Sequence, residues 1–141
     1  MESVLGEQVP KNVTVVLCHR SRVSDADLAY LRGMTHLREL DFRGTQVTDA
    51  GLVHLRGLTK LKQLELERTR VSDAGLAYLV GLRQLEVLFL NGTQVTDAGL
   101  VHLQGLTGLE ILDVAGTAVT EAGEQELQKA LPKCDIFFPG L

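Results

Sequence analysis

The chain has 141 residues, of which 45% are hydrophobic and 23% charged, a balance typical of a folded protein. A net charge of -4 argues against a nucleic-acid ligand, because such ligands are held mainly by Lys and Arg at the phosphates. There is no apolar run of about 18 residues to cross a membrane, and the N-terminal residues lack the apolar segment of a secretion signal. We therefore expect a cytoplasmic protein.

Residues 1–12 fit no repeating pattern and are predicted to form an N-terminal cap segment. Residues 13–22 align with residues 37–46 at a distance of 24 residues, which predicts a first strand that lacks its own helix. The cap segment is expected to cover the open edge of this strand, since an uncovered edge invites pairing with another chain. We expect a monomer or a dimer paired through that edge.

Units of 24 residues begin at Val23, Val47, Val71 and Val95. A fixed period of this length with leucines at fixed offsets predicts a solenoid of stacked units, and residues 13–118 form the repeating part. Units that begin at Val23 and Val71 resemble each other, as do those at Val47 and Val95. Residues 23–70 and 71–118 are identical at 29 of 48 positions, which indicates a duplicated two-unit module or a designed array.

Each unit is predicted to run from a strand through a turn into a short helix. Alternation around Leu64 and Leu66 turns these leucines inward and leaves the residues between them facing out. A threonine after the strand, such as Thr69, can bond the backbone of the turn through its hydroxyl. At the helix, Thr48 is the expected N-cap, and Asp49 in the first turn suits the positive end of the helix dipole. Gly57 is expected to close the helix after Leu55.

Residues 119–141 are predicted to form a C-terminal capping repeat. Its helix, residues 121–130, is longer and more polar than the others and ends at Pro132. Ile136 and Phe138 keep the inward strand register, and Pro139 removes a donor from the segment that follows. A polar outer helix with a terminated strand is what the end of a solenoid requires.

The units resemble leucine-rich repeats of the ribonuclease-inhibitor-like and F-box-associated class, and most of all bacterial repeats with T-x-V-T-D-A-G-L units. The phrase LPKCDI at residues 131–136 is similar to the ending of such proteins. The resemblance implies an α/β leucine-rich repeat solenoid, a right-handed horseshoe fragment with a parallel sheet on the concave face and short helices on the convex face. It also implies a role in protein binding through the concave sheet. Threonine stands where this class usually has asparagine.

The outward strand positions form rows across the sheet in which neighbouring side chains touch. The first row reads Val15, Glu39, Gln63, Val87, Ile111 and Asp135. The second row reads Leu17, Asp41, Glu65, Phe89, Asp113 and Phe137. The third row reads His19, Arg43, Glu67, Asn91 and Ala115.

Two groups in these rows are candidates for binding. An acidic group, comprising Glu39, Asp41, Glu65 and Glu67, is bordered by Arg43 and Arg68. It is interpreted either as a solvated face in which Arg43 pairs with Glu67, or as a docking site for Lys or Arg of a partner; a flat sheet of carboxylates lacks the cage that a metal requires.

The second group is an apolar patch of Val87, Phe89 and Ile111 at positions that should face water, with Ala115 behind it. An aromatic side chain flanked by aliphatic ones is a good anchor for a partner. The alternative is that the terminal segment 137–141 folds over the patch, or that curvature half-buries it.

Other constellations point to chemistry only weakly. Arginines gather where the first three strands end, but nearby carboxylates oppose a phosphate site there; they are Arg20, Arg22, Arg43, Arg68 and Arg70. Tyr30, His54, Tyr78 and His102 share one helical offset and predict a surface stripe, because zinc would require two histidines close together. Cys18 and Cys134 are expected to be packing residues without a disulfide. No catalytic set, cofactor site or metal site is predicted.

The sequence thus predicts a non-enzymatic module that binds a protein or peptide on its concave sheet face, without nucleic acid or membrane. The predicted partner-binding residues are Glu39, Asp41, Arg43, Glu65, Glu67, Val87, Phe89, Ile111 and Asp113. The alternative is an idealised, designed or structural repeat scaffold with no selected partner.

Overall fold

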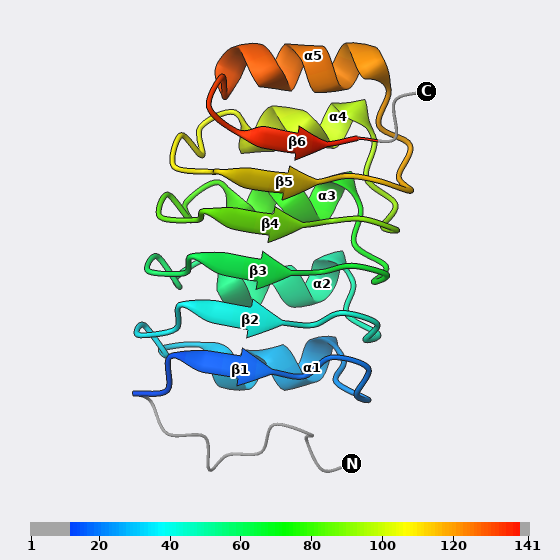
Figure 1. The fold of residues 1–141 in the computed structure, drawn as a ribbon. Helices are drawn as coiled ribbons and strands as arrows, with labels where there is room; N and C mark the ends of the chain where they lie inside the picture. The colour runs from blue at the N-terminus through cyan, green and yellow to red at the C-terminus, as the bar shows by residue number, and fades with distance from the viewer. Residues whose placement is uncertain (1–11, 139–141) are drawn as a thin grey trace.

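A computed structural model describes residues 12–138 as an open solenoid in which six parallel strands form one sheet (Figure 1). The strands follow one another across the sheet in chain order, so each pairs only with the units before and after it. Their bounds are β1 Val15–Leu17, β2 Glu39–Asp41, β3 Gln63–Glu65, β4 Val87–Phe89, β5 Ile111–Asp113 and β6 Asp135–Phe137. The predicted architecture is confirmed.

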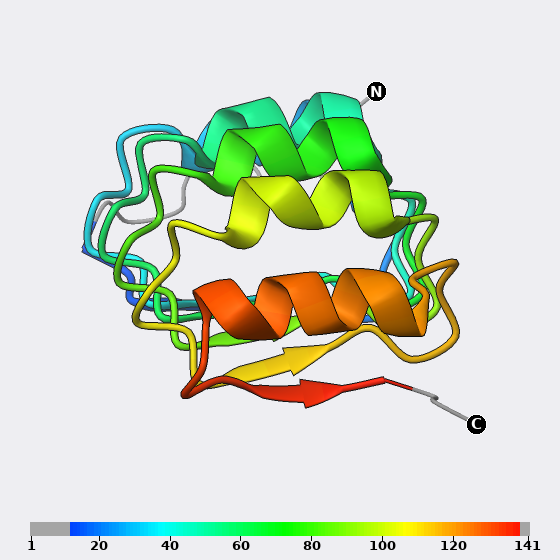
Figure 2. The same ribbon diagram turned by 90° about the horizontal axis from the view of Figure 1, so that it is seen from above.

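Helices form a second layer on one side of the sheet, which Figure 2 shows from the end of the stack. Each of the four repeats has a short α-helix that tightens into a turn of 3-10 helix before the chain returns to the next strand. The α-helices are α1 Asp25–Leu28, α2 Asp49–Leu52, α3 Asp73–Leu76, α4 Asp97–Leu100 and α5 Glu121–Ala130. The 3-10 turns are η1 Ala29–Leu31, η2 Val53–Leu55, η3 Ala77–Leu79 and η4 Val101–Leu103.

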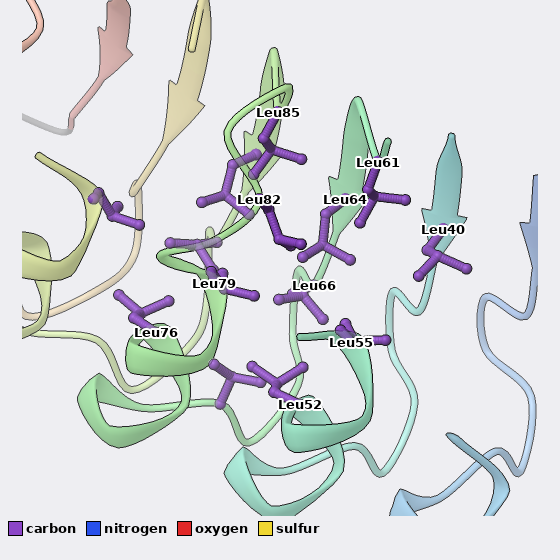
Figure 3. Packing of buried hydrophobic residues seen from close by; sticks show 14 of the residues in the cluster. Leu40, Leu52, Leu55, Leu61, Leu64, Leu66, Leu76, Leu79, Leu82 and Leu85 are labelled. Carbon is purple, nitrogen blue, oxygen red and sulfur yellow. The ribbon is translucent and has the colours of Figure 1, made fainter. Parts of the chain in front are cut away.

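The core lies between the two layers and is built almost wholly from leucine and valine. In Figure 3, leucines from strands, turns and helices point toward one another in this interior. The register pairs Leu40 with Leu64, Leu64 with Leu88, and Leu88 with Leu112, so identical residues stack along the solenoid. Each of these side chains is fully buried. No unit could bury its leucines alone, and stacking supplies the missing wall.

The local signals predicted from the repeat are mostly present. Thr48 has extended backbone angles and accepts a hydrogen bond from the Ala50 N–H, as expected of an N-cap. The Thr69 hydroxyl donates to the Leu66 carbonyl at 2.7 Å, which holds the turn after β3. The predicted closure by a glycine is wrong in detail: the helical segment does end at Leu55, but Gly57 lacks the left-handed conformation of a glycine cap.

An aspartate ladder joins successive units on the helix side. The Asp73 carboxylate of one unit accepts two hydrogen bonds from Thr96 of the next, from its N–H at 2.7 Å and from its hydroxyl at 2.5 Å. The same pair of bonds recurs along the stack. Its members are Asp25 with Thr48, Asp49 with Ser72, Asp73 with Thr96 and Asp97 with Thr120. The ladder therefore fixes the offset between units.

Glycine in the D-A-G-L segment makes room for this ladder. A Cβ atom on Gly99 would lie 2.3 Å from Asp73 Oδ1, far inside van der Waals contact. The first unit has no preceding aspartate, and there the position holds Asp27, whose carboxylate instead accepts the Ser24 N–H. The first D-A-x-L segment thus differs from the three that follow in having no glycine at this position.

The last unit departs from the others as predicted. Helix α5 spans Glu121–Ala130 and carries Glu121 where the preceding units have the ladder aspartate. Ile136 and Phe138 pack against the core, and Phe137 faces outward with 54% exposure. The predicted cover for the edge of β1 falls on residues that lie, apart from Asn12, outside the described range, as do residues 139–141 of the terminal segment. The assignment of 1–12, 13–118 and 119–141 to cap, repeats and capping repeat stays a prediction.

Candidate functional site

The outward rows lie where the sequence places them. Val15 pairs with Glu39, Glu39 with Gln63 and so on to Asp135, and the second row runs in the same register from Leu17 to Phe137. Because a one-residue slip would exchange the inner and outer sets, this register decides which side chains the sheet presents. All nine predicted partner-binding residues lie on this face or at its strand exits.

Arg43 holds the acidic group together. Its Nη2 lies 2.8 Å from Asp41 Oδ2, and its Nε lies 3.2 Å from Glu65 Oε2 and 3.8 Å from Glu67 Oε2. Asp41 and Glu65 are only 2% and 8% exposed, so their charges depend on this guanidinium and on neighbouring donors. The hydrogen bond from Arg43 to Asp41 raises the pKa of the arginine. The expected pairing of Arg43 with Glu67 is therefore its weakest contact.

Two further side chains contact these carboxylates. Gln63 Nε2 donates to Glu65 Oε1 at 2.5 Å, and His19 Nδ1 lies 3.2 Å from Asp41 Oδ2. The like charges of Asp41 and Glu65 on paired strands are thus offset within the chain. Most of the carboxylate oxygens that a partner's Lys or Arg would seek are already engaged.

Glu67 is the exception in this group. Burial, and then the nearby Glu65 carboxylate, raise its pKa above the ordinary value. Its Oε2 atom is buried without a hydrogen bond, since the 3.8 Å distance to Arg43 Nε is too long for one. One buried acceptor on this face is consequently left for another donor.

The apolar patch of Val87, Phe89 and Ile111 lies on the outer face of β4 and β5. Val87 and Ile111 are register partners, and Phe89 is paired with Asp113. All three apolar side chains are half-buried and none belongs to the interior cluster. The surroundings on the sheet therefore cover these three side chains only in part, and the outer surface of the patch remains accessible. Asp113 beside it accepts the Ala115 N–H at 2.9 Å.

Arginine and glycine share one row just beyond the strands. Arg20, Gly44, Arg68, Gly92 and Gly116 all have a positive φ, a conformation that favours glycine. The Arg68 stem lies over Gly92, where an added Cβ would be 3.3 Å from Arg68 Cγ, and Arg20 lies over Gly44 in the same way. Two arginines thus occupy strained positions, and each depends on a bare glycine beside it.

The predicted stripe of tyrosine and histidine is present on the helix side, and two of its side chains contact arginines. Arg32 Nε donates to His54 Nδ1 at 2.7 Å, and the Arg56 guanidinium lies 5.7 Å from the centre of the Tyr78 ring. Burial and the charge of Arg32 lower the pKa of His54, so the neutral imidazole is favoured. Such contacts are those of a structural surface.

The two thiols are packed, as expected. Cys18 and Cys134 are both free and buried, and burial raises the pKa of Cys134 to about 11. Across residues 12–138, no three side chains of His, Cys, Asp or Glu converge as metal ligands. Within the same range, no helix has the length and hydrophobicity needed to cross a bilayer.

Sequence reasoning missed two features of these surfaces. It assigned the aspartate of each D-A-G-L segment to its own helix, whereas the side chain binds the next unit. The signal was available in the glycine three residues after each N-cap, which is absent only from the first D-A-x-L segment. It also missed the left-handed conformation of Arg20 and Arg68, although glycine at the equivalent positions pointed to it.

Comparison with known proteins finds similarity to leucine-rich repeats. The leucine-rich repeat family model matches residues 33–55. No curated protein matches the chain in sequence. Among solved structures, an internalin (inlF) from Listeria monocytogenes is 25% identical with a TM-score of 0.77, and the match covers 93% of this chain and 36% of that one.

Two other structures share the fold at lower identity. Internalin C2 from Listeria monocytogenes is 20% identical with a TM-score of 0.64, and the match covers 96% of this chain and 65% of that one. A leucine-rich repeat protein from Leptospira interrogans is 18% identical with a TM-score of 0.60, over 91% and 38% of the two chains. The chain therefore spans less than two thirds of the length of each of these proteins.

Proposed function

We propose that this chain, whose fold and repeat units are similar to those of leucine-rich repeat proteins, is a non-enzymatic module that binds a protein or peptide partner on its sheet face. Leucine-rich repeat folds generally serve protein interaction. The observation that carries the proposal is the apolar patch of Val87, Phe89 and Ile111, which occupies positions directed toward solvent.

The patch has the composition of a binding anchor. A half-buried phenylalanine flanked by two aliphatic side chains offers a partner apolar area on a surface already fixed by the sheet, so little ordering is required on binding. Charged side chains surround it, with Asp113 on one side and the acidic group on the other. An apolar centre with a polar rim is the usual anatomy of a protein interface.

Arg43 and its carboxylates belong to the rim of the proposed interface. Asp41 and Glu65 are committed to Arg43, so we assign them the role of fixing that guanidinium beside the patch. Glu39 and Asp113 are partly exposed and are proposed to meet polar groups of the partner. Glu65→Lys is a poor probe of binding, since it would place a second cation against Arg43 in a buried site.

Compartment and assembly form part of the same proposal. Two buried, unpaired thiols suit a reducing compartment, which supports a cytoplasmic location.

Val15 and Leu17 on the edge strand β1 are 41% and 58% exposed, which supports edge pairing between two copies when the edge is uncovered. Sedimentation over a range of concentrations distinguishes a monomer from such a dimer.

The test measures a partner's affinity for two matched variants. A partner is isolated with the immobilised chain, purified, and titrated calorimetrically against wild type, Phe89→Ala and Val101→Ala. Val101 is 56% exposed on the helix side and controls for the loss of an exposed apolar side chain. We expect Phe89→Ala to weaken binding by about tenfold or more, and Val101→Ala to change it little. Equal effects, or none, would reject the sheet face as the binding surface.

A scaffold without a selected partner is the alternative that the internal repetition favours. Residues 23–70 and 71–118 share 29 of 48 positions, which an idealised array would also show. In that case the outward rows would vary freely among related sequences and substitution of Phe89 would leave every interaction unchanged. Restriction of Val87, Phe89 and Ile111 to apolar residues in relatives would favour binding instead.

A further inference from the structure

A hollow opens beyond the ends of strands β1 to β4, next to the acidic group. It has a volume of about 290 Å³ and is lined by Arg20, Arg43, Gly44, Glu67, Arg68 and Asn91. Its lining combines guanidinium groups with carboxylate and amide oxygens, and Gly44 contributes no side chain between Arg20 and Arg68. This space continues the sheet face on which we place the partner, and the inference that follows rests on that proposed function.

Two of the three guanidinium groups are available. Arg43 is committed to Asp41 and Glu65, whereas within residues 12–138 neither the Arg20 nor the Arg68 side chain has a hydrogen bond or an ion pair. Their strands are separated by β2, and the stems of both lean over the neighbouring glycine. The Arg20 stem lies over Gly44 and the Arg68 stem over Gly92, and both arginines line the same hollow, where an anion can meet them.

Two buried oxygens in the same hollow lack donors. Glu67 Oε2 and Asn91 Oδ1 are both buried, and neither accepts a hydrogen bond from the described residues. Buried acceptors without a partner are rare in folded proteins, because their desolvation is not offset. The hollow therefore offers two sites for an anion and, beside them, two acceptors for N–H groups.

This combination selects one ligand chemistry among the candidates. The phosphodiester of a nucleic-acid backbone would satisfy the arginines, but its phosphate carries no N–H donor for Glu67 and Asn91. A lysine would satisfy the acceptors but face three guanidinium groups. An acidic residue in an extended peptide carries both parts, with a carboxylate on its side chain and N–H groups on the backbone beside it.

We propose that this hollow receives an acidic side chain of an extended partner segment, with the carboxylate on Arg20 and Arg68 and adjacent backbone N–H groups on Glu67 and Asn91. The apolar patch on β4 and β5 then binds residues further along the same segment. The partner is accordingly an acidic peptide with apolar neighbours, and the acidic group beside Arg43 serves to position the site instead of attracting basic residues.

The positive φ of Arg20 and Arg68 provides variants that keep the fold. Arg20→Gly and Arg68→Gly remove the guanidinium and place at each position the residue that its left-handed backbone favours. Loss of binding in these variants cannot then arise from unfolding, which their melting temperatures check. Arg70→Gln, at a neighbouring exposed arginine, is the matched control.

The binding experiment follows the arginine Nε–H signals by NMR during titration with N-acetyl-aspartate N-methylamide. The neutral N-acetyl-asparagine N-methylamide and inorganic phosphate are titrated in parallel. We expect saturable shifts at Arg20 and Arg68 with the acidic probe only, and an affinity about tenfold lower in each Arg→Gly variant but not in Arg70→Gln. Equal binding of phosphate, or of the neutral probe, would overturn the proposal.

Asn91→Ala tests the acceptor half of the site. The proposal predicts weaker binding of the acidic probe with little change in melting temperature, because the Asn91 oxygen has no partner in the free chain. A lower melting temperature with unchanged binding would mean that the Asn91 amide forms a hydrogen bond within the chain. That result would overturn the assignment of Asn91 as an acceptor for the partner. For a full-length partner, loss of affinity with Phe89→Ala but not with the Arg20→Gly/Arg68→Gly double variant would reject the hollow and leave the proposed function standing.

Discussion

On the helix side of the solenoid the same aspartate, hydroxyl and glycine recur from unit to unit, whereas on the sheet face the side chain in a given row changes from strand to strand. The ladder from Asp25 to Thr120 couples each unit to the next, so its residues are fixed by stacking. The second outward row runs through aspartate, glutamate and phenylalanine at the same backbone geometry. The outward positions of the sheet take no part in stacking, and there the residue type changes from one unit to the next. We therefore place partner binding on these outward positions.

The largest effect should come from breaking the ladder with one methyl group. Gly99→Ala would place a Cβ 2.3 Å from Asp73 Oδ1 and displace the carboxylate from Thr96. We expect a loss of about 2–3 kcal/mol in the free energy of unfolding, measured by urea denaturation. Gly105→Ala in the same unit meets nothing within 4 Å and should be neutral or slightly stabilising.

A double variant separates steric from hydrogen-bonding effects in the ladder. Asp73→Ala alone should cost about 1–3 kcal/mol, because the Thr96 N–H and hydroxyl lose their acceptor. In that background Gly99→Ala has no carboxylate to displace, so its own cost should become smaller and leave only the 3.1 Å approach of the new Cβ to the backbone Cα at position 73. Additive losses in the double variant would contradict the coupling between Asp73 and Gly99.

The sequence predicted the fold and its register well because each leucine, valine and threonine occurs at the same offset in several units. It predicted the location of Phe89 and the acidic group for the same reason. It could not predict that Arg43 would engage Asp41 and Glu65 ahead of Glu67, since that choice depends on side-chain rotamers. The hollow was also beyond reach, because it depends on left-handed backbone at Arg20 and Arg68.

The strand exits should respond in the opposite direction to the ladder. Arg68 has a φ of 56°, and the equivalent residues Gly92 and Gly116 show that glycine fits this position. We expect Arg68→Gly to raise the free energy of unfolding by about 0.5–1 kcal/mol through relief of strain, less the entropy that glycine adds to the unfolded chain. Thermal unfolding with Arg70→Gln alongside checks it, and a lower melting temperature would count against strain at Arg68.

The smallest effect concerns pH and Glu67. Its pKa in the folded chain is raised, so the folded state binds a proton more readily than the unfolded state does. The associated stability is complete below the unfolded pKa, near 4.5, and is lost as pH rises through the folded pKa. We expect Glu67→Gln to remove this decline when unfolding is measured between about pH 4 and 7. Parallel pH profiles for the two proteins would show that Glu67 is not responsible.

Solvent protection by a bound partner tests the division of labour between the two faces most directly. Hydroxyl-radical footprinting of the chain with and without its captured partner reports the accessibility of individual side chains. We predict that protection concentrates at Val87, Phe89 and Ile111, while Tyr78, Val80 and Val101 on the helix side keep their reactivity. Protection of the helix side with an unchanged sheet face would contradict the account.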